Sequence, residues 1–257
     1  MVEWNMDRWK YFDITSRDQP LGNPLSIAKL DEIIALLDLN PGDKVLDVAC
    51  GNGEMLVRIV ERYGARGVGL DLSPYVIKDA ELKKAERAPN VDLQFIEIDG
   101  AKYQPEDSDM FDIASCIGAS WIWQGYRGTL RALKDLVTPG GLVAVGEPHW
   151  LQPPHLDYLA SEGFTADLFS THHGNVVAGE EEGLTFLYSV ATNQDDWDRY
   201  EGLRYRATVR YARSNPQDLD LQEITGRVNK SREAYLRWGR DTLGWAIYLF
   251  QTPDGIS

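Results

Sequence analysis

The sequence is poor in cysteine and has no long apolar run. Its two cysteines, Cys50 and Cys116, are too few for a framework of disulfides. No apolar stretch approaches the roughly 18 residues that a membrane-spanning helix needs. Residues 1–5 also lack the basic region and apolar run of a signal peptide. We therefore expect a cytoplasmic protein with reduced thiols and no membrane partner.

Positive charge is scarce as well. The chain has 26 Lys and Arg against 40 Asp and Glu, a formal net charge of −14. A surface of that sign repels phosphate groups, so we expect no nucleic acid partner. Four arginines stand close together, at Arg204, Arg206, Arg210 and Arg213. We interpret them as one solvated helix face rather than as a phosphate site.

Short apolar runs alternate with stretches of helical periodicity over the first 150 residues. This alternation predicts an α/β fold, with a doubly wound, mainly parallel sheet and helices on both of its faces. Two late apolar runs bring the sheet to seven strands and predict an antiparallel edge strand. The strands are expected at residues 45–50, 67–70, 91–98, 111–117, 142–146, 184–192 and 244–250.

Segments outside the sheet are expected to cover it. We predict a single domain over residues 1–257, in which residues 1–40 form an N-terminal helical cover. Residues 148–183 are rich in Pro, His, Gly and acids, and we interpret them as an insertion of short helices that forms a lid. Later helices are predicted at 195–213 and 219–240. A solvated tail would not carry Trp4, Trp9, Tyr11 and Phe12, so we hypothesise that the N-terminal segment folds over the ligand site.

A glycine-rich turn follows the first predicted strand. Asp47 lies on the strand, and Gly51 and Gly53 lie in the turn that opens a helix. Ligands of open α/β sheets bind outside the carboxyl ends of the strands, where glycine lets the backbone approach them closely. A dinucleotide fingerprint would need a third glycine at Leu56, and no Gly-Lys-Ser/Thr phosphate loop follows.

The D-x-x-x-G-x-G pattern resembles the first motif of class I S-adenosylmethionine (SAM) methyltransferases, which have a Rossmann-like fold. That family usually has glycine where this chain has Ala49. Given this motif, Asp71, at the end of the second strand, is suited to accept both ribose hydroxyls. The resemblance implies that Asp99 meets the adenine amino group and that the fourth strand passes beneath the methionine part. The cofactor-binding residues predicted are Asp47, Ala49, Cys50, Gly51, Gly53, Asp71, Leu72, Asp99, Gly100, Ala101, Cys116 and Ile117.

The resemblance extends over nearly the full length to one largely uncharacterised bacterial branch of these methyltransferases. It is carried by residues 52–56, 118–122, 146–150 and 196–201 and by the closing Gly244-Trp245. It implies the fold and SAM as cofactor, but no particular acceptor. Cys50 and Cys116 fall on strands predicted to be neighbours, which leaves a disulfide between them open.

The acceptor side is expected at the same strand ends. Transfer of a methyl group from a sulfonium is an in-line displacement, which needs a base only when the acceptor must lose a proton early. Imidazole titrates near neutral pH, so His149 is the first candidate base, with Glu147 as the second. A structural role for His149 stays equally open. An aromatic cage or simple packing is predicted for Trp121, Trp123, Trp150, Tyr188 and Trp197.

The function predicted is methyl transfer from SAM to a small-molecule acceptor. A SAM-binding protein without catalysis stays open, as does a SAM-consuming cyclisation or elimination that releases methylthioadenosine. No metal is expected, because His155, His172 and His173 lack the spacing of a metal site. A homodimer is left open.

Overall fold

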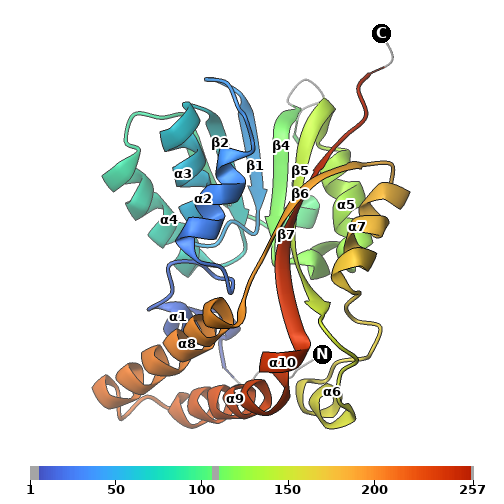
Figure 1. The fold of residues 1–257 in the computed structure, drawn as a ribbon. Helices are drawn as coiled ribbons and strands as arrows, with labels where there is room; N and C mark the ends of the chain where they lie inside the picture. Colours follow the sequence, from blue (N-terminus) through green and yellow to red (C-terminus); the bar gives the residue numbers. More distant parts are fainter. Residues whose placement is uncertain (1–5, 106–109, 256–257) are drawn as a thin grey trace.

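The computed structural model of the protein describes residues 6–105 and 110–255. Its centre is one seven-stranded sheet in the order β3-β2-β1-β4-β5-β7-β6 (Figure 1). The first five strands are parallel, and β7 runs antiparallel to both of its neighbours, β5 and β6. The strands are β1 (Lys44–Val48), β2 (Arg66–Asp71), β3 (Leu93–Glu97), β4 (Phe111–Ile117), β5 (Val137–Trp150), β6 (Thr185–Ala191) and β7 (Leu243–Gln251). The predicted fold class is thus confirmed.

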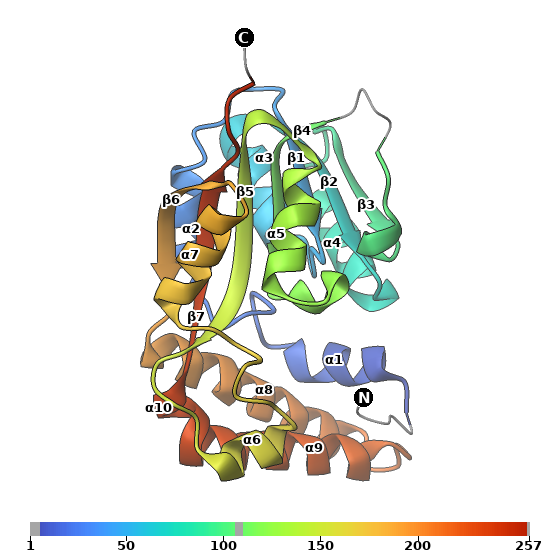
Figure 2. The same ribbon diagram turned by 90° about the vertical axis from the view of Figure 1, so that its right-hand side faces the viewer.

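Helices cover both faces of the sheet. One face carries α2 (Ile27–Ala35), α3 (Glu54–Tyr63) and α4 (Pro74–Arg87), and the other carries α5 (Tyr126–Lys134) and α7 (His172–Glu181) (Figures 1 and 2). Two hydrophobic clusters fill the space on the two sides. Central strand residues such as Val45, Leu46 and Ile113 are fully buried, since a parallel sheet is covered on both sides.

A layer of helices faces the carboxyl ends of the parallel strands, which point downward in Figures 1 and 2. We call it the helical cap. It contains α1 (Arg8–Ser16), α6 (Leu156–Glu162), α8 (Gln194–Ser214) and α9 (Leu221–Ala234), followed by the π turn η3 (Tyr235–Gly239) and α10 (Arg240–Thr242). None of the helices in the described part of the chain is long and apolar enough to cross a membrane.

The sequence predicted that residues 148–183 form a lid, but in the structure they belong to three different elements: the end of β5, α6 and α7. Residues 148–150 continue β5, which is much longer than the predicted 142–146 because its far end still pairs with β7. Helix α6 belongs to the helical cap, whereas α7 packs on the sheet beside α5. The larger part of the cap is the α8–α9 pair, which the sequence predicted as helices without a location.

Two further interpretations change. Arg206 and Arg210 both pair with Asp18, and the guanidinium of Arg204 contacts the hydroxyl of Tyr11, so these arginines are not simply a solvated face. The two cysteines are free and belong to opposite faces of the sheet, Cys50 in one core cluster and Cys116 in the other. A disulfide between them is therefore excluded in this fold.

Candidate functional site

The glycine turn after β1 has the backbone that the sequence predicted. Ala49, Gly51 and Gly53 have φ values of 58°, 55° and 71°, all in the left-handed region. Alanine is strained there, which explains why the motif more often carries glycine at position 49. The turn is fixed to the neighbouring strand by the Cys50 amide, which donates to the Leu70 carbonyl at 2.9 Å. Gly53 is then the N-cap of α3.

The two glycines of the turn differ in the space around them. A Cβ on Gly53 would lie 2.6 Å from the Phe95 ring and 3.0 Å from Ala80, whereas one on Gly51 would meet nothing within 4 Å. We expect Gly53→Ala to lower the free energy of unfolding by about 3 kcal/mol, from backbone strain and overpacking. Gly51→Ala should cost only about 1 kcal/mol, from strain alone. Urea unfolding of the two variants checks this; equal losses would contradict it.

Asp71 links the turn to the end of β2. One of its carboxylate oxygens accepts from the Gly51 amide at 3.0 Å, and the other accepts from the Ser73 amide at 2.9 Å. Burial raises the pKa of this carboxyl, while the backbone donors act in the opposite direction. A carboxylate has about four lone-pair sites, so Asp71 can accept further donors beside these amides. The geometry therefore suits a diol, as the sequence predicted for a ribose.

Asp47 has a different setting from the one expected. Its side chain is buried on β1, and Ser115 of β4 donates to it at 2.7 Å. Burial raises the pKa of Asp47 to about 7, despite that hydrogen bond. This carboxyl therefore ties β1 to β4 beneath the turn.

The adenine side of the predicted site lies at the end of β3. Asp99 is the N-cap of the short helix η1 (Gly100–Lys102), and its carboxylate accepts from the Ala101 amide at 3.1 Å. Leu72, just beyond β2, is 41% exposed and offers an apolar surface at the strand ends. At the end of β4, Cys116 is buried and the Ile117 carbonyl faces the N-terminal part of the chain.

Residues 17–24, which we call the cover segment, cross these strand ends. Asn52 of the glycine turn donates to the Pro20 carbonyl at 3.2 Å, and Asn23 donates to the Ile117 carbonyl at 3.0 Å. Gln19 donates to the Tyr200 carbonyl of α8 at 2.9 Å. The cover segment thus joins β1, β4 and the helical cap over the predicted site. Trp4, part of the same prediction, lies outside the described residues.

Gln19 holds a polar atom that suits a ligand. The side chain is 7% exposed, and within the described residues its carbonyl oxygen has no hydrogen-bond partner. A buried acceptor without a partner is costly, and a bound donor would remove that cost. Sequence reasoning missed Gln19; the polar stretch 15–18 beside it was the only signal.

The two candidate bases both point to the α5–α7 side of the sheet. Glu147 is 5% exposed, and burial raises its pKa to about 7. His149 contacts the Tyr248 hydroxyl at 3.3 Å, and its ring lies 5.1 Å from that of His172. Burial, reinforced by His172, lowers the pKa of His149 to about 4. The imidazole is therefore neutral at pH 7 and fixed among aromatic neighbours.

The structure does not gather the five predicted pocket aromatics. Trp150 packs in the cap with Tyr158 and Phe169. Tyr188, on β6, donates to Glu32 of α2. Trp197, on α8, stacks on Tyr235 of η3, with ring centroids 6.1 Å apart.

The two remaining aromatic residues, Trp121 and Trp123, lie in the segment that follows β4. They belong to η2 (Ser120–Trp123), where Trp121 is 73% exposed and Trp123 is half-buried. Trp123 lines a pocket of about 480 Å³ together with Glu147. The acceptor-side residues that the structure brings together are therefore Trp123 and Glu147.

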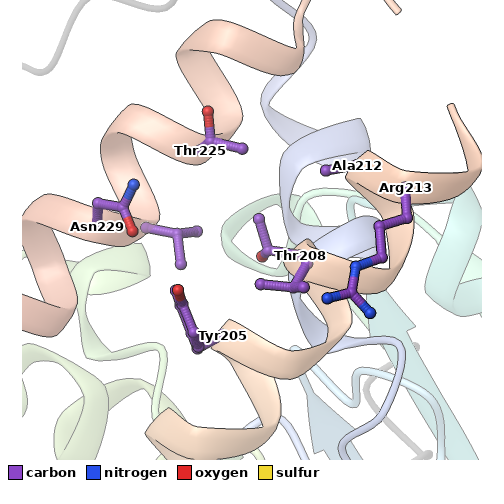
Figure 3. Close-up of a pocket in the computed structure, with 8 residues that line it drawn as sticks. Tyr205, Thr208, Ala212, Arg213, Thr225 and Asn229 are labelled. Atoms are coloured by element: carbon purple, nitrogen blue, oxygen red, sulfur yellow. The ribbon is translucent and has the colours of Figure 1, made fainter. Parts of the chain in front are cut away.

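A separate pocket of about 350 Å³ opens on the surface of the helical cap, between α8 and α9 (Figure 3). Tyr205, Thr208 and Arg213 line it from α8, and Thr225 and Asn229 line it from α9. None of the predicted site residues borders this pocket. It therefore takes no part in the site described above.

Comparison with known proteins agrees with the geometry. A family model described as a methyltransferase domain matches residues 45–141. The uncharacterized protein YjhP of Escherichia coli K12 is 30% identical over 95% of this chain and 98% of its own length. A SAM-dependent methyltransferase from Geobacter sulfurreducens, solved with S-adenosylhomocysteine, is 30% identical, with a TM-score of 0.88 over 94% of this chain and 97% of that one. The chain belongs to the class I SAM-dependent methyltransferases. Its cofactor is S-adenosylmethionine.

A relative with a named activity matches a smaller part of the chain. Trans-aconitate 2-methyltransferase of Escherichia coli O157:H7 (strain EC4115) is 30% identical over 61% of this chain and 56% of its own length. The full-length match to YjhP, by contrast, places this methyltransferase in an uncharacterised bacterial branch.

Proposed function

We propose that this methyltransferase methylates a small-molecule acceptor by in-line displacement, beneath the cover segment and the helical cap. The cover segment carries the proposal. It forms hydrogen bonds with Asn52 of the glycine turn, Ile117 of β4 and Tyr200 of α8. These three bonds hold it across the strand ends. A covered site suits an acceptor that is small enough to fit entirely beneath the cover. The net charge of −14 disfavours a nucleic acid acceptor.

The residues at the strand ends fit the cofactor. Asp71 would accept hydrogen bonds from the ribose hydroxyls, and Asp99 with Gly100 and Ala101 would bind the adenine. The turn from Ala49 to Gly53 would hold the amino-acid part, to which Gln19 offers its unpartnered carbonyl oxygen. Leu72 would pack on the adenosine, and Cys116 and Ile117 would form the floor.

When bound, SAM supplies an electrophilic methyl group on a sulfonium. The chain's own contribution is to orient the acceptor and exclude water, which accounts for much of the barrier reduction in reactions between two bound molecules. Asp47 fixes β1 against β4 and so holds the turn and the floor in register. Of the two candidate bases we retain Glu147, because His149 is enclosed by Tyr248, His172 and Gly244.

The named relative supports the size class of the acceptor. The trans-aconitate enzyme acts on a small acid, and its match here extends over 158 residues. That match makes a small acceptor the natural proposal.

A screen with labelled SAM tests the proposal. Small thiols, amines, acids and phenols are offered in turn, and both the methylated product and S-adenosylhomocysteine are counted by mass spectrometry. We expect one class to give equal amounts of the two. Methylthioadenosine as the only nucleoside product would instead support cyclisation or elimination, and an absence of turnover with every class would contradict small-molecule methyl transfer.

A further inference from the structure

Two buried polar atoms of the pocket beside Glu147 have no partner in the described part of the chain. The pocket lies between helix α7 and the first turns of helix α5, and its volume is about 480 Å³. Among the described residues, one carboxylate oxygen of Glu147 and the hydroxyl of Tyr126 have no hydrogen-bond partner. Both residues line the pocket. Native proteins satisfy nearly all buried polar groups, so two such atoms in one pocket indicate a ligand that would bind both.

The pocket shares a wall with the cofactor site. Glu147 directly follows Gly146, whose carbonyl accepts from the Gly118 amide at 2.9 Å. Gly118 also meets the cover segment, because a Cβ there would lie 2.2 Å from the Asn23 side-chain oxygen. The short helix η2 continues from this point to Trp123, which lines the pocket. A molecule in the pocket would therefore lie beside the end of β4.

The chemistry of the lining selects among acceptor classes. Glu147 offers a hydrogen-bond acceptor that is negative when ionised, and Trp123 and Tyr126 offer aromatic faces. Such a set favours a cation or an N–H donor. The arginines at the pocket, Arg127 and Arg131, pair with Glu182 and are thus already neutralised. An acidic acceptor would have to break those pairs and approach Glu147 as a like charge.

We propose that this pocket is the acceptor subsite and that it takes a small amine, with the nitrogen at the free oxygen of Glu147 and the carbon skeleton against Trp123. The inference rests on the proposed function, since it names the acceptor class of that same site. Tyr126 would accept from or donate to a further polar group of the amine. Burial raises the pKa of Glu147 to about 7, so the group can both give and take a proton near neutral pH.

Glu147, as carboxylate, takes one proton from the bound ammonium, which leaves a neutral amine with a free lone pair. That lone pair forms the N–C bond to the methyl group, while the C–S bond breaks with its electron pair left on sulfur. The methylated amine leaves as an ammonium ion, and the proton on Glu147 passes to water.

Calorimetry on the full chain saturated with S-adenosylhomocysteine tests the pocket without turnover. The probes are phenethylamine, 2-phenylethanol and 3-phenylpropionate, which share a skeleton and differ in the head group. We expect phenethylamine to bind at least tenfold more tightly than the other two. Glu147→Gln should lower phenethylamine affinity by at least tenfold and leave S-adenosylhomocysteine affinity unchanged, which also shows that the variant is folded.

Asp135→Asn is the matched control, because Asp135 is an exposed carboxylate at the end of α5 that does not line the pocket. It should change phenethylamine affinity by less than twofold. Preference for 3-phenylpropionate, no saturable amine binding, or an unchanged affinity in Glu147→Gln would each overturn the amine pocket. Methyl transfer to another class in the screen would then still uphold the proposed function, whereas no transfer to any class would refute that function separately.

Discussion

Asp71→Ala is expected to weaken binding of S-adenosylmethionine and S-adenosylhomocysteine by about 100-fold. The carboxylate stands at the end of β2, where it accepts from the Gly51 and Ser73 amides and can accept further donors. Losing two charge-assisted hydrogen bonds to a diol costs about 3 kcal/mol in total, which corresponds to that factor. The glycine turn also loses a partner, since the Gly51 amide donates to the same carboxylate. Calorimetric titration of the purified variant gives the change directly.

Ser73→Ala is the control for this experiment. Ser73 supplies only its backbone amide to Asp71, and alanine retains that amide. We expect its affinity to stay within threefold of wild type. Circular dichroism of Asp71→Ala should show a folded protein, because the carboxylate lies at the edge of the sheet core. Wild-type affinity in Asp71→Ala would refute the cofactor site proposed here.

Removal of residues 1–20 is expected to be the second large effect, with about 30-fold weaker binding of S-adenosylhomocysteine. The deletion removes α1 and the part of the cover segment that Asn52 contacts through Pro20. It also removes Gln19 and its unpartnered carbonyl oxygen. The lost Gln19 bond to a charged group, about 1.5 kcal/mol, and the lost Asn52–Pro20 bond, about 0.5 kcal/mol, together account for the factor. The loss should show mainly as faster dissociation in stopped-flow displacement.

A point variant distinguishes the loss of a ligand contact from unfolding of the shortened protein. The deletion exposes apolar surface around Ile224 and Val228, which pack against Tyr11 and Ile14. Gln19→Ala retains that packing and should still weaken binding about tenfold, as expected for a hydrogen bond to a charged group. Gln194→Ala, a glutamine of the cap that bonds to Asp241 instead, should have no effect. Wild-type dissociation from both the deletion and Gln19→Ala would contradict a cover over the cofactor.

Much of the sheet could be predicted because buried parallel strands appear as continuous apolar runs. The run from Val45 to Val48 is one such strand, and Asp71 could be found because it ends the next. The far end of β5 was missed, since Pro148 and His149 interrupt the apolar pattern while β7 still pairs with them. Hydrophobic periodicity identified α8 and α9 as helices, but periodicity carries no information on which surface a helix covers.

The acceptor side could be predicted less well, because its features depend on tertiary contacts. Residue type alone selected Trp150 and Tyr188, yet one is packed in the cap and the other bonds to α2. Gln19 and Tyr126 are notable only because each has a buried polar atom without a partner among residues 6–105 and 110–255, which no sequence pattern reports. His149 has the right residue type for a base, but burial lowers its pKa to about 4.

A crystal structure of the protein with S-adenosylhomocysteine tests the central claim most directly. We expect the ligand to lie across the ends of β1, β2 and β4, under the cover segment. Its ribose hydroxyls should contact the carboxylate of Asp71, and its sulfur should face the side where Glu147 lines the pocket. A ligand bound elsewhere, or one at the strand ends with its ribose away from Asp71, would contradict the account.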